Sequence, residues 1–377
     1  MTNLALDNLE KNLKKEDTYK SERIGIFEDF VKVGLPSNKV DRWKYFDLSS
    51  KAKKVKNTNI KDSIISISGK KSDKLNFYTA QKKDITPDIY FKPKEFIKNE
   101  PMLDLNLSCS NQVNILDIKS DQEEIITITI ESDGENLYLP RIIINIDKGI
   151  SAKILLKNLS SSGLTNLLIE YSLEKDSNLE IYRFNNSEST LVETNIVYLK
   201  ERSNLNLINL STPKGSSRFQ LFSLHLESFS LSSCNTISIP SDNSNDDILI
   251  DNSLMNSDCE NKSGIRAILD SKSICSFQSL IYIKDSVIGS KAEQDCKGFL
   301  LSDDSVMNAK PQMNIFNDDV ICKHGATIGS LDKQEIFYLC SRGINKEEAE
   351  KLLLNGHISE YINENSILRN YLPGDFR

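Results

Sequence analysis

The arrangement of apolar and polar residues changes character twice along the chain. In the first hundred residues, apolar positions recur three and four apart, which is the spacing of one face of an α-helix. Gly34-Leu35-Pro36 should end the second predicted helix, because proline cannot continue a helix and glycine tolerates its terminal conformation. The two predicted apolar faces comprise Leu4, Leu6, Leu9 and Leu13, and Ile24, Phe27, Phe30 and Val31.

From about Asn114 onward the pattern is that of an all-β unit. Short β-branched runs recur at roughly 10 to 16 residues, separated by clusters of Asp, Gly, Asn and Ser. Phe222, Leu224 and Leu226 alternate as along one face of a strand, and a bulge or turn is predicted near Glu227. This pattern is compatible with a sandwich, a barrel or a β-solenoid and does not distinguish between them. The runs span residues 125–130, 142–146, 167–171, 179–182, 195–199, 205–208 and 221–226.

The last fifty residues return to a helical pattern. Asp332 and Asn345 are predicted to cap two helices, each with a glutamate three residues on, and Gly343 and Gly356 are predicted to end them. A third helix is predicted within residues 358–371. The chain is therefore divided into an N-terminal mixed, mostly helical region (1–105), a β core (106–326) and a C-terminal helical domain (327–377).

The composition argues against several classes of protein. The 377 residues carry a formal net charge of −7, which gives no general attraction to nucleic acid or to an anionic membrane. No apolar run approaches the roughly 18 residues of a membrane span, and the start lacks the features of a secretory signal. Seven scattered cysteines do not resemble a disulfide framework, so we expect a soluble, cytoplasmic protein with reduced thiols. Neither glycine-rich nucleotide-binding motif occurs, so any use of ATP would belong to a partner.

The segment that contains Cys322 and His324 is the strongest candidate for chemistry. If Val320 to His324 is extended, the thiol and the imidazole project from one face of a strand. An imidazolium lowers the pKa of a nearby thiol, and both groups are good ligands for soft or borderline metals. The alternative is structural, with Cys322 filling core space beside Val320 and His324 hydrogen-bonded to the backbone. The pattern alone does not distinguish the metal-binding interpretation from the structural one.

The remaining histidines and several cysteines have plainer interpretations. His225 is expected at the surface or at the end of the core, and His357 is expected to cap a helix or to lie exposed. Cys259, Cys275 and Cys296 lack the spacing of a metal site and are expected to be small buried residues, with stacking of their thiols in a coiled β core as an alternative.

Longer motifs lie between Gly34 and Tyr45 and between Gln294 and Ile344, and together they resemble the SufB/SufD family, SufD members most of all. At the N-terminus, Gly34-Leu35-Pro36 followed by Trp43-Lys44-Tyr45 is similar to an element of SufD members. Between roughly residues 50 and 270 only the β pattern agrees. The C-terminal match comprises Lys310 to Ile315, Asp318 to Val320, Cys322-x-His324-Gly325-Ala326-Thr327-Ile328-Gly329, Leu331-Asp332 and Phe337-Tyr338-Leu339-x-Ser341-Arg342-Gly343-Ile344, with Gln294 and Leu300 to Asp303 upstream.

This resemblance implies a mainly β fold, a right-handed parallel β-helix flanked by helical regions. It implies a scaffold subunit that is not itself an enzyme, in a complex that builds iron–sulfur clusters with a SufB-like subunit and a SufC-like ATPase. An iron–sulfur cluster would be held transiently, in the complex only. FAD is a further cofactor suggested for the complex, and a homodimer is an alternative assembly. No nucleic-acid or membrane partner is expected, because of the net charge and the lack of a long apolar run.

The resemblance also assigns residues. Cys322 and His324 match positions near the interface with SufB and are candidate metal ligands there, while Phe337, Tyr338 and Arg342 match the region that contacts the ATPase. Two positions depart from the family pattern: Lys323 replaces a usual serine, and Asn252 stands where histidine is frequent. The second departure weakens a ligand role at that position, because an amide is a poor ligand for soft metals.

The second hypothesis is that the chain is a β-solenoid enzyme, either a lyase or a hydrolase that uses Cys322 and His324. A solenoid lyase would show dense charged side chains along one groove, which the sequence lacks. A Cys–His hydrolase would need a cavity beside the thiol and a third orienting group. A zinc site has too few ligands unless a partner contributes.

Overall fold

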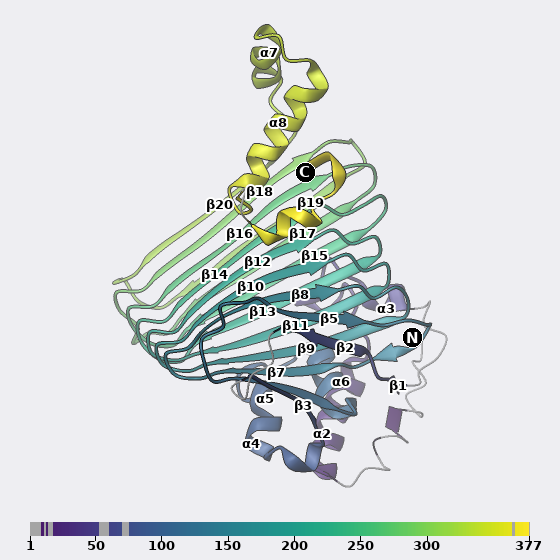
Figure 1. Ribbon diagram of the computed structural model, residues 1–377, viewed down its shortest axis with the longest axis vertical. Helices are drawn as coiled ribbons and strands as arrows, with labels where there is room; N and C mark the ends of the chain where they lie inside the picture. Colours follow the sequence, from purple (N-terminus) through teal and green to yellow (C-terminus); the bar gives the residue numbers. More distant parts are fainter. Residues whose placement is uncertain are drawn as a thin grey trace.

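The computed structural model describes residues 9–10, 13, 18–52, 60–69, 75–363 and 366–376. Two members of the first predicted apolar face, Leu4 and Leu6, lie outside the described residues. The fold is mainly β, with parallel strands wound into a solenoid of about eight turns and helices at both ends, which confirms the predicted class (Figure 1). None of the described helices is long and apolar enough to cross a membrane.

Short helices precede and follow the strands, and several single turns of 3-10 helix connect them. The α-helices are α2 (Lys20–Val33), α3 (Leu48–Lys51), α4 (Pro87–Tyr90), α5 (Lys92–Phe96), α6 (Pro101–Cys109), α7 (Lys333–Ser341) and α8 (Lys346–Ser359), and the 3-10 turns are η1 (Asp41–Trp43), η3 (Lys82–Asp84), η4 (Ile367–Tyr371) and η5 (Gly374–Phe376).

The strands become longer and more regular toward the C-terminus. They are β1 (Ile60–Lys61), β2 (Ile64–Ser68), β3 (Leu75–Ala80), β4 (Val113–Ile118), β5 (Ile126–Glu131), β6 (Leu137–Tyr138), β7 (Arg141–Ile146), β8 (Ser151–Asn158), β9 (Leu164–Leu173), β10 (Asn178–Asn185), β11 (Thr190–Leu199), β12 (Asn204–Ser211), β13 (Ser216–His225), β14 (Leu231–Ser238), β15 (Asn245–Leu254), β16 (Glu260–Leu269), β17 (Ile274–Ile283), β18 (Lys291–Leu300), β19 (Val306–Ile315) and β20 (Ile321–Gly329).

From β7 onward, successive strands alternate between two sheets. One runs β19-β17-β15-β13-β11-β9-β7-β4-β3 and the other β2-β5-β8-β10-β12-β14-β16-β18-β20, so each coil contributes one strand to each sheet. The coils are in register: from β8 to β20 each strand pairs in parallel with the equivalent strand one coil later. The β runs of the sequence therefore correspond to coils of a β-helix, and the sandwich and barrel alternatives are wrong.

One turn between the sheets repeats in every middle coil. Its central residue has a left-handed backbone, and its amide donates a hydrogen bond to a carbonyl of the next coil. Asp176, Arg202, Phe229 and Asp258 hold this position without the conformational freedom of glycine, so the neighbouring coil must stabilise the strained turn. The residues at this position are Gly149, Asp176, Arg202, Phe229, Asp258 and Gly289.

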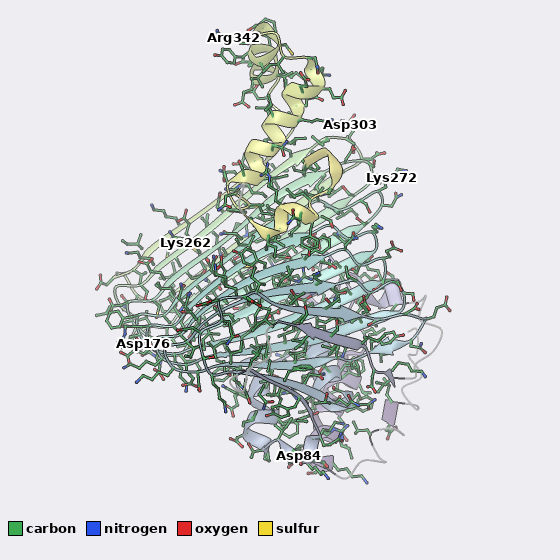
Figure 2. The ribbon with its side chains drawn as sticks, in the orientation of Figure 1. Asp84, Asp176, Lys262, Lys272, Asp303 and Arg342 are labelled. Atoms are coloured by element: carbon green, nitrogen blue, oxygen red, sulfur yellow. The ribbon has the colours of Figure 1, made fainter. Side chains whose placement is uncertain are left out.

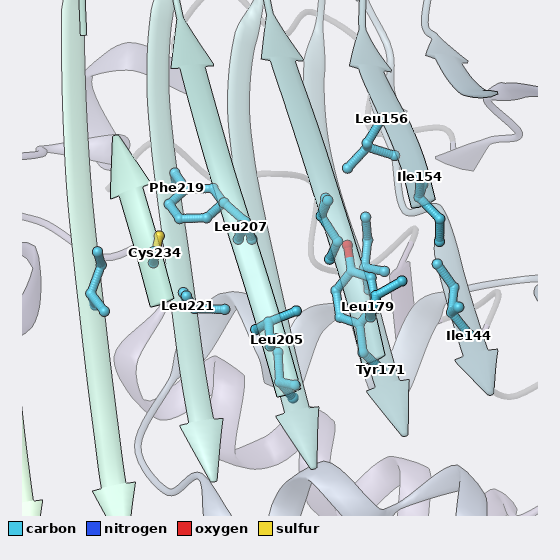
Figure 3. Close-up of a cluster of buried hydrophobic side chains, with 14 of the residues drawn as sticks. Ile144, Ile154, Leu156, Tyr171, Leu179, Leu205, Leu207, Phe219, Leu221 and Cys234 are labelled. Atoms are coloured by element: carbon cyan, nitrogen blue, oxygen red, sulfur yellow. The ribbon is translucent and has the colours of Figure 1, made fainter. Parts of the chain in front are cut away.

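The space between the two sheets is filled mainly by apolar side chains, from Leu116 on β4 to Cys296 on β18. Tyr171, Leu205 and Leu221 are typical members, each at most 1% exposed (Figure 3). In parallel strands that are in register, paired residues point to the same face, so each inward position forms a column along the solenoid. Alternation along one strand thus decides which residues enter the core.

The N-terminal helices cover the outer face of one sheet. Helix α6 is wholly buried there, and its Asn106 Nδ2 donates to the carbonyls of Pro140 and Asn166. Trp43 is fully buried, with its Nε1 donating to Glu100 at 3.2 Å and the Arg218 guanidinium 4.0 Å from its ring. The Trp-Lys-Tyr element of the sequence therefore anchors the helical region to the solenoid.

The predicted helix ends are confirmed except at one position. Gly34 ends α2, and Asp332 and Asn345 cap α7 and α8 through their side chains. Helix α8, however, continues through Gly356 to Ser359, because the apolar side of this helix packs on the solenoid and outweighs the low helix propensity of glycine. The third helix predicted within residues 358–371 is wrong for the described residues, because 358–359 are the end of α8 and 367–371 form only the 3-10 turn η4.

Candidate functional site

Cys322 and His324 lie on β20, the last strand of its sheet. This strand pairs with β18 on one side only, with Cys322 opposite Ala292 and His324 opposite Gln294. Ala292 and Gln294 are inward-facing and at most 3% exposed, so both residues of β20 continue inward columns at the end of the solenoid. The extended backbone and the shared face are as the sequence predicts.

The thiol of Cys322 is half-buried. It packs with Met313 and Val320 against an apolar cluster that includes Ala292. Burial raises the pKa of Cys322, and a hydrogen bond from the backbone of Ala292 offsets part of this rise. The sequence-level expectation that the imidazole lowers this pKa is not met, and the structural alternative holds in part for the thiol.

His324 differs from its neighbour because its side chain is exposed. Two donors do not complete the coordination of a metal ion, and no three His, Cys, Asp or Glu side chains gather into a metal site within the described ranges. The arrangement therefore presents a thiol and an imidazole at the rim of the solenoid, open to whatever covers that end.

We call the rim formed by β19 and β20 the open end. Each of these strands is hydrogen-bonded on one side only, so one row of backbone N–H and C=O groups faces outward. Free strand edges of this kind are templates for pairing with another chain. Apolar side chains accompany these free groups: Val306, Ile315, Phe316, Ile321 and Ile328 are between 37% and 62% exposed.

Beyond the open end, α7 and α8 project from the solenoid as an arm (Figure 1). On α7, Phe337 is 75% and Tyr338 is 58% exposed. Arg342, which lies near the tip of the arm (Figure 2), stacks on Tyr338 with 5.3 Å between its guanidinium carbon and the ring centre. A groove of about 710 Å³ separates the arm from the solenoid and is lined by residues that include Leu301, Ile336, Phe337 and Cys340. The arm thus exposes aromatic and cationic groups.

The comparison with known protein families decides the identity. Residues 128–357 match the family model for the SUF-system FeS cluster assembly SufBD core domain. The chain belongs to the SufBD core family. The matched range contains Cys322, His324 and the aromatic residues of α7, whereas the N-terminal helical region lies outside it.

Individual relatives agree with this assignment over a shorter stretch. The chain is 32% identical over 102 residues to the iron–sulfur cluster assembly protein SufD of Escherichia coli, and 36% identical over 88 residues to the protein of that name from Bacillus subtilis. The aligned stretches cover 27% and 23% of this chain, and 24% and 20% of those relatives. Within the SufBD family the chain is therefore SufD-like.

Other positions in this SufBD-family chain differ from their sequence-level interpretation. His225 is fully buried, with Nδ1 2.8 Å from Ser230 Oγ and Nε2 2.8 Å from Ser232 Oγ, and burial lowers its pKa to about 4. His357 is also buried, against the ring of Phe299, and burial lowers its pKa to about 4. Neither is a surface residue.

Asn252, the departure from the family pattern, is buried and accepts a hydrogen bond from Asn261 Nδ2 at 2.9 Å. It therefore serves the interior of the solenoid. Cys259, Cys275 and Cys296 are buried, as expected for small core residues.

Ionisable residues inside the solenoid were missed by the sequence reasoning. Arg183 and Glu193 form a bidentate ion pair with both contacts at 2.7 Å, and the pair is at most 1% exposed. Asp246 is fully buried, with one carboxylate oxygen accepting from Ser238 Oγ at 2.7 Å and the other without a hydrogen-bond partner among the described residues. A signal was present, because each residue has inward parity in its strand.

Proposed function

We propose that this chain is a non-catalytic scaffold subunit of an iron–sulfur cluster assembly complex, in which it pairs with a SufB-like subunit and a SufC-like ATPase. Membership of the SufBD core family supports the assembly of clusters as the process. The observation that carries the pairing is the open end, where two strands that continue the parallel winding have no further coil on them.

The SufB-like subunit would bind at the open end by adding strands to β19 and β20. Main-chain hydrogen bonds would satisfy the free edge groups, and the exposed Ile321 and Ile328 would be buried in the contact. Covering this rim would place the partner's own side chains over the thiol and the imidazole. A ligand set split between two chains assembles only when the chains do.

The nascent cluster is the cargo of this site. Thiolate and imidazole are suitable donors for iron in such a cluster. Cys322 would bind as the thiolate, and the raised pKa of its thiol in the uncovered chain favours the protonated form until a metal or the partner arrives. The flavin, FAD, is assigned to the complex as a whole and to no residue of this chain.

The arm would bind the ATPase. Phe337 and Tyr338 supply large apolar surfaces and Arg342 a cation, which are the side chains enriched at the centres of protein interfaces. Hydrolysis of ATP in the partner would then move the arm relative to the solenoid. This chain has no nucleotide-binding motif of its own.

The alternative, a hydrolase that uses Cys322 as nucleophile, is less favoured. Such enzymes lower the pKa of the thiol, whereas burial raises it here. Rapid alkylation of Cys322 by iodoacetamide, together with turnover of a thioester, would support the hydrolase instead.

The proposal is tested by co-expression of this chain with SufB-like and SufC-like proteins, followed by purification through a tag on this chain. We expect both partners in the purified material. Recovery of the tagged chain alone, or as a homodimer that excludes the SufB-like protein, would contradict the proposal.

A further inference from the structure

Gln294 is a buried polar side chain on β18, the strand that pairs with β20 of the open end. It is 1% exposed and faces the interior, where its Nε2 donates to the carbonyl of Gln312 on β19 at 3.2 Å. Its Oε1 is buried and has no hydrogen-bond partner among the described residues. A buried acceptor without a hydrogen bond is energetically unfavourable. A neighbouring side chain that can donate to Oε1 would therefore stabilise the chain.

The register identifies the nearest candidate. His324 is paired with Gln294 in the parallel ladder between β18 and β20, so the two side chains leave the same face of neighbouring strands about 4.8 Å apart. On the other side of Gln294, the Ser263 hydroxyl donates to the carbonyl of Glu293 at 3.5 Å and lies 3.4 Å from Ser279 Oγ. His324 is exposed and carries a ring N–H in either neutral tautomer.

Gln294 differs from two other incompletely hydrogen-bonded amides, on the neighbouring strands β15 and β16. Asn252 Nδ2 and Asn261 Oδ1 are also buried without a partner among the described residues. The next coil, however, places Ile281 above Asn252 and Ala292 above Asn261, and neither side chain has a polar atom. Of these three amides, Gln294 is the one whose column continues with a hydrogen-bond donor.

We infer that Gln294 is a positioning residue for His324: its Oε1 accepts a hydrogen bond from one ring N–H of His324 and thereby selects one tautomer. The other ring nitrogen then carries its lone pair toward the open end. Metal-binding histidines are oriented in this way by an acceptor behind them. The use of that lone pair for the cargo rests on the proposed function, whereas the hydrogen bond belongs to this chain alone.

The test is nuclear magnetic resonance of the full chain labelled with ¹⁵N-histidine, at about pH 9, where imidazoles are neutral. Long-range ¹H–¹⁵N spectra report the tautomer of each ring, and loss of a signal set in His324→Asn assigns His324 among the three histidines. We expect one dominant tautomer for His324. In Gln294→Met the tautomer ratio should change roughly five-fold, the effect of a net hydrogen bond of about 1 kcal/mol.

The matched control is Gln278→Met. Gln278 is another buried glutamine, 3% exposed, whose Nε2 donates to the carbonyl of Arg42 at 3.1 Å on the outer face of the other sheet. This variant removes a buried amide of the same size and should leave the His324 tautomer unchanged.

Two results would overturn the inference. An equal tautomer ratio in wild type and Gln294→Met would show that another group, such as water, satisfies Oε1. A wild-type spectrum in which His324 has the tautomer ratio of free imidazole would also overturn the inference. This result needs no variant, so it holds even if Gln294→Met does not fold. Because no partner is present in this experiment, its failure is independent of the co-purification that tests the proposed function.

Discussion

The two ends of the solenoid are built differently. At the N-terminal end, β2 and β3 reverse direction and pair antiparallel with β5 and β4, and their inward residues, such as Ile65 and Phe77, pack on the core. At the C-terminal end, β19 and β20 keep the parallel winding, and no described strand follows them. A reversal of strand direction interrupts the parallel pattern on which a further parallel strand could be added. A winding that continues to the edge leaves that pattern available for pairing with another chain. We therefore interpret the first end as finished and the second as an interface.

The interior of the middle coils and the open end should also respond differently to substitution. Groups between the sheets are sealed, so their charge and hydrogen bonds determine stability. Groups at the open end are exposed in the single chain, so their effect should be on assembly. Four predictions test this contrast, in order of decreasing effect on the free energy of unfolding.

Glu193→Gln should have the largest effect. It leaves Arg183 charged and at most 1% exposed without its carboxylate partner, and we expect a loss of roughly 3–5 kcal/mol in the free energy of unfolding, measured by denaturant titration. The control is Glu188→Gln, which removes the same charge from the pair with Lys214, whose side chains are more than 50% exposed, and should cost less than about 1 kcal/mol. Similar losses in both variants would show that the interior is not sealed.

Asp246→Asn should have the opposite sign at neutral pH. Burial raises the pKa of Asp246 from 3.8 to about 6. The folded chain therefore binds a proton more tightly than the unfolded chain, and the stability from this group is present below about pH 3.8 and lost as pH rises to about 6. Removal of the charge should then stabilise the chain at pH 7 by roughly 3 kcal/mol. The difference in stability between Asp246→Asn and the wild type should vanish near pH 4.

The neighbouring Asp247 provides the control for this prediction. It is fully buried on the opposite face of β15, where it forms an ion pair with Arg218. Asp247→Asn leaves that arginine unpaired and should destabilise the chain at pH 7. If Asp246→Asn also destabilises it at pH 7, the inward carboxylate has a cationic or water partner.

Ile328→Lys at the open end should change the free energy of unfolding by less than about 0.5 kcal/mol, because Ile328 is 37% exposed. The same change should abolish co-purification of the SufB-like protein, since it places a charge in the proposed interface. Leu231→Lys, at a position 40% exposed in the middle coils, is the control that should keep the partner. Retention of the partner by Ile328→Lys would locate the interface elsewhere.

His324→Ala should have little effect on stability, because the side chain is exposed and water can replace it as the donor to Gln294 Oε1 once the ring is removed. We expect the complex to assemble and its yield of iron–sulfur cluster, measured by absorbance and iron content, to fall several-fold. Lys323→Ala, an adjacent exposed residue, should retain the yield. A normal yield from His324→Ala would remove this imidazole from the mechanism.

Some of the candidate site could be predicted from local pattern. The alternation around Cys322 and His324 predicts a strand with both side chains on one face, and the structure agrees. The environment of each group could not be predicted, because it depends on coils roughly 30 residues away in the chain. The same applies to His225, which is covered on either side by Leu199 and Leu254 of the neighbouring coils, although its two serine partners are close in sequence.

By itself, the sequence determined the β class, the helical regions at both ends, the caps of α7 and α8 and the membership of the SufBD family. These depend on local periodicity, on side chains that bond within a turn and on motifs that lie close together along the chain. Only the tertiary structure decided which residues share a column, which polar groups are buried together and which end of the winding stays open. Those features are set by contacts between successive coils, whereas the alternation within one strand shows only which face of the sheet a side chain is on.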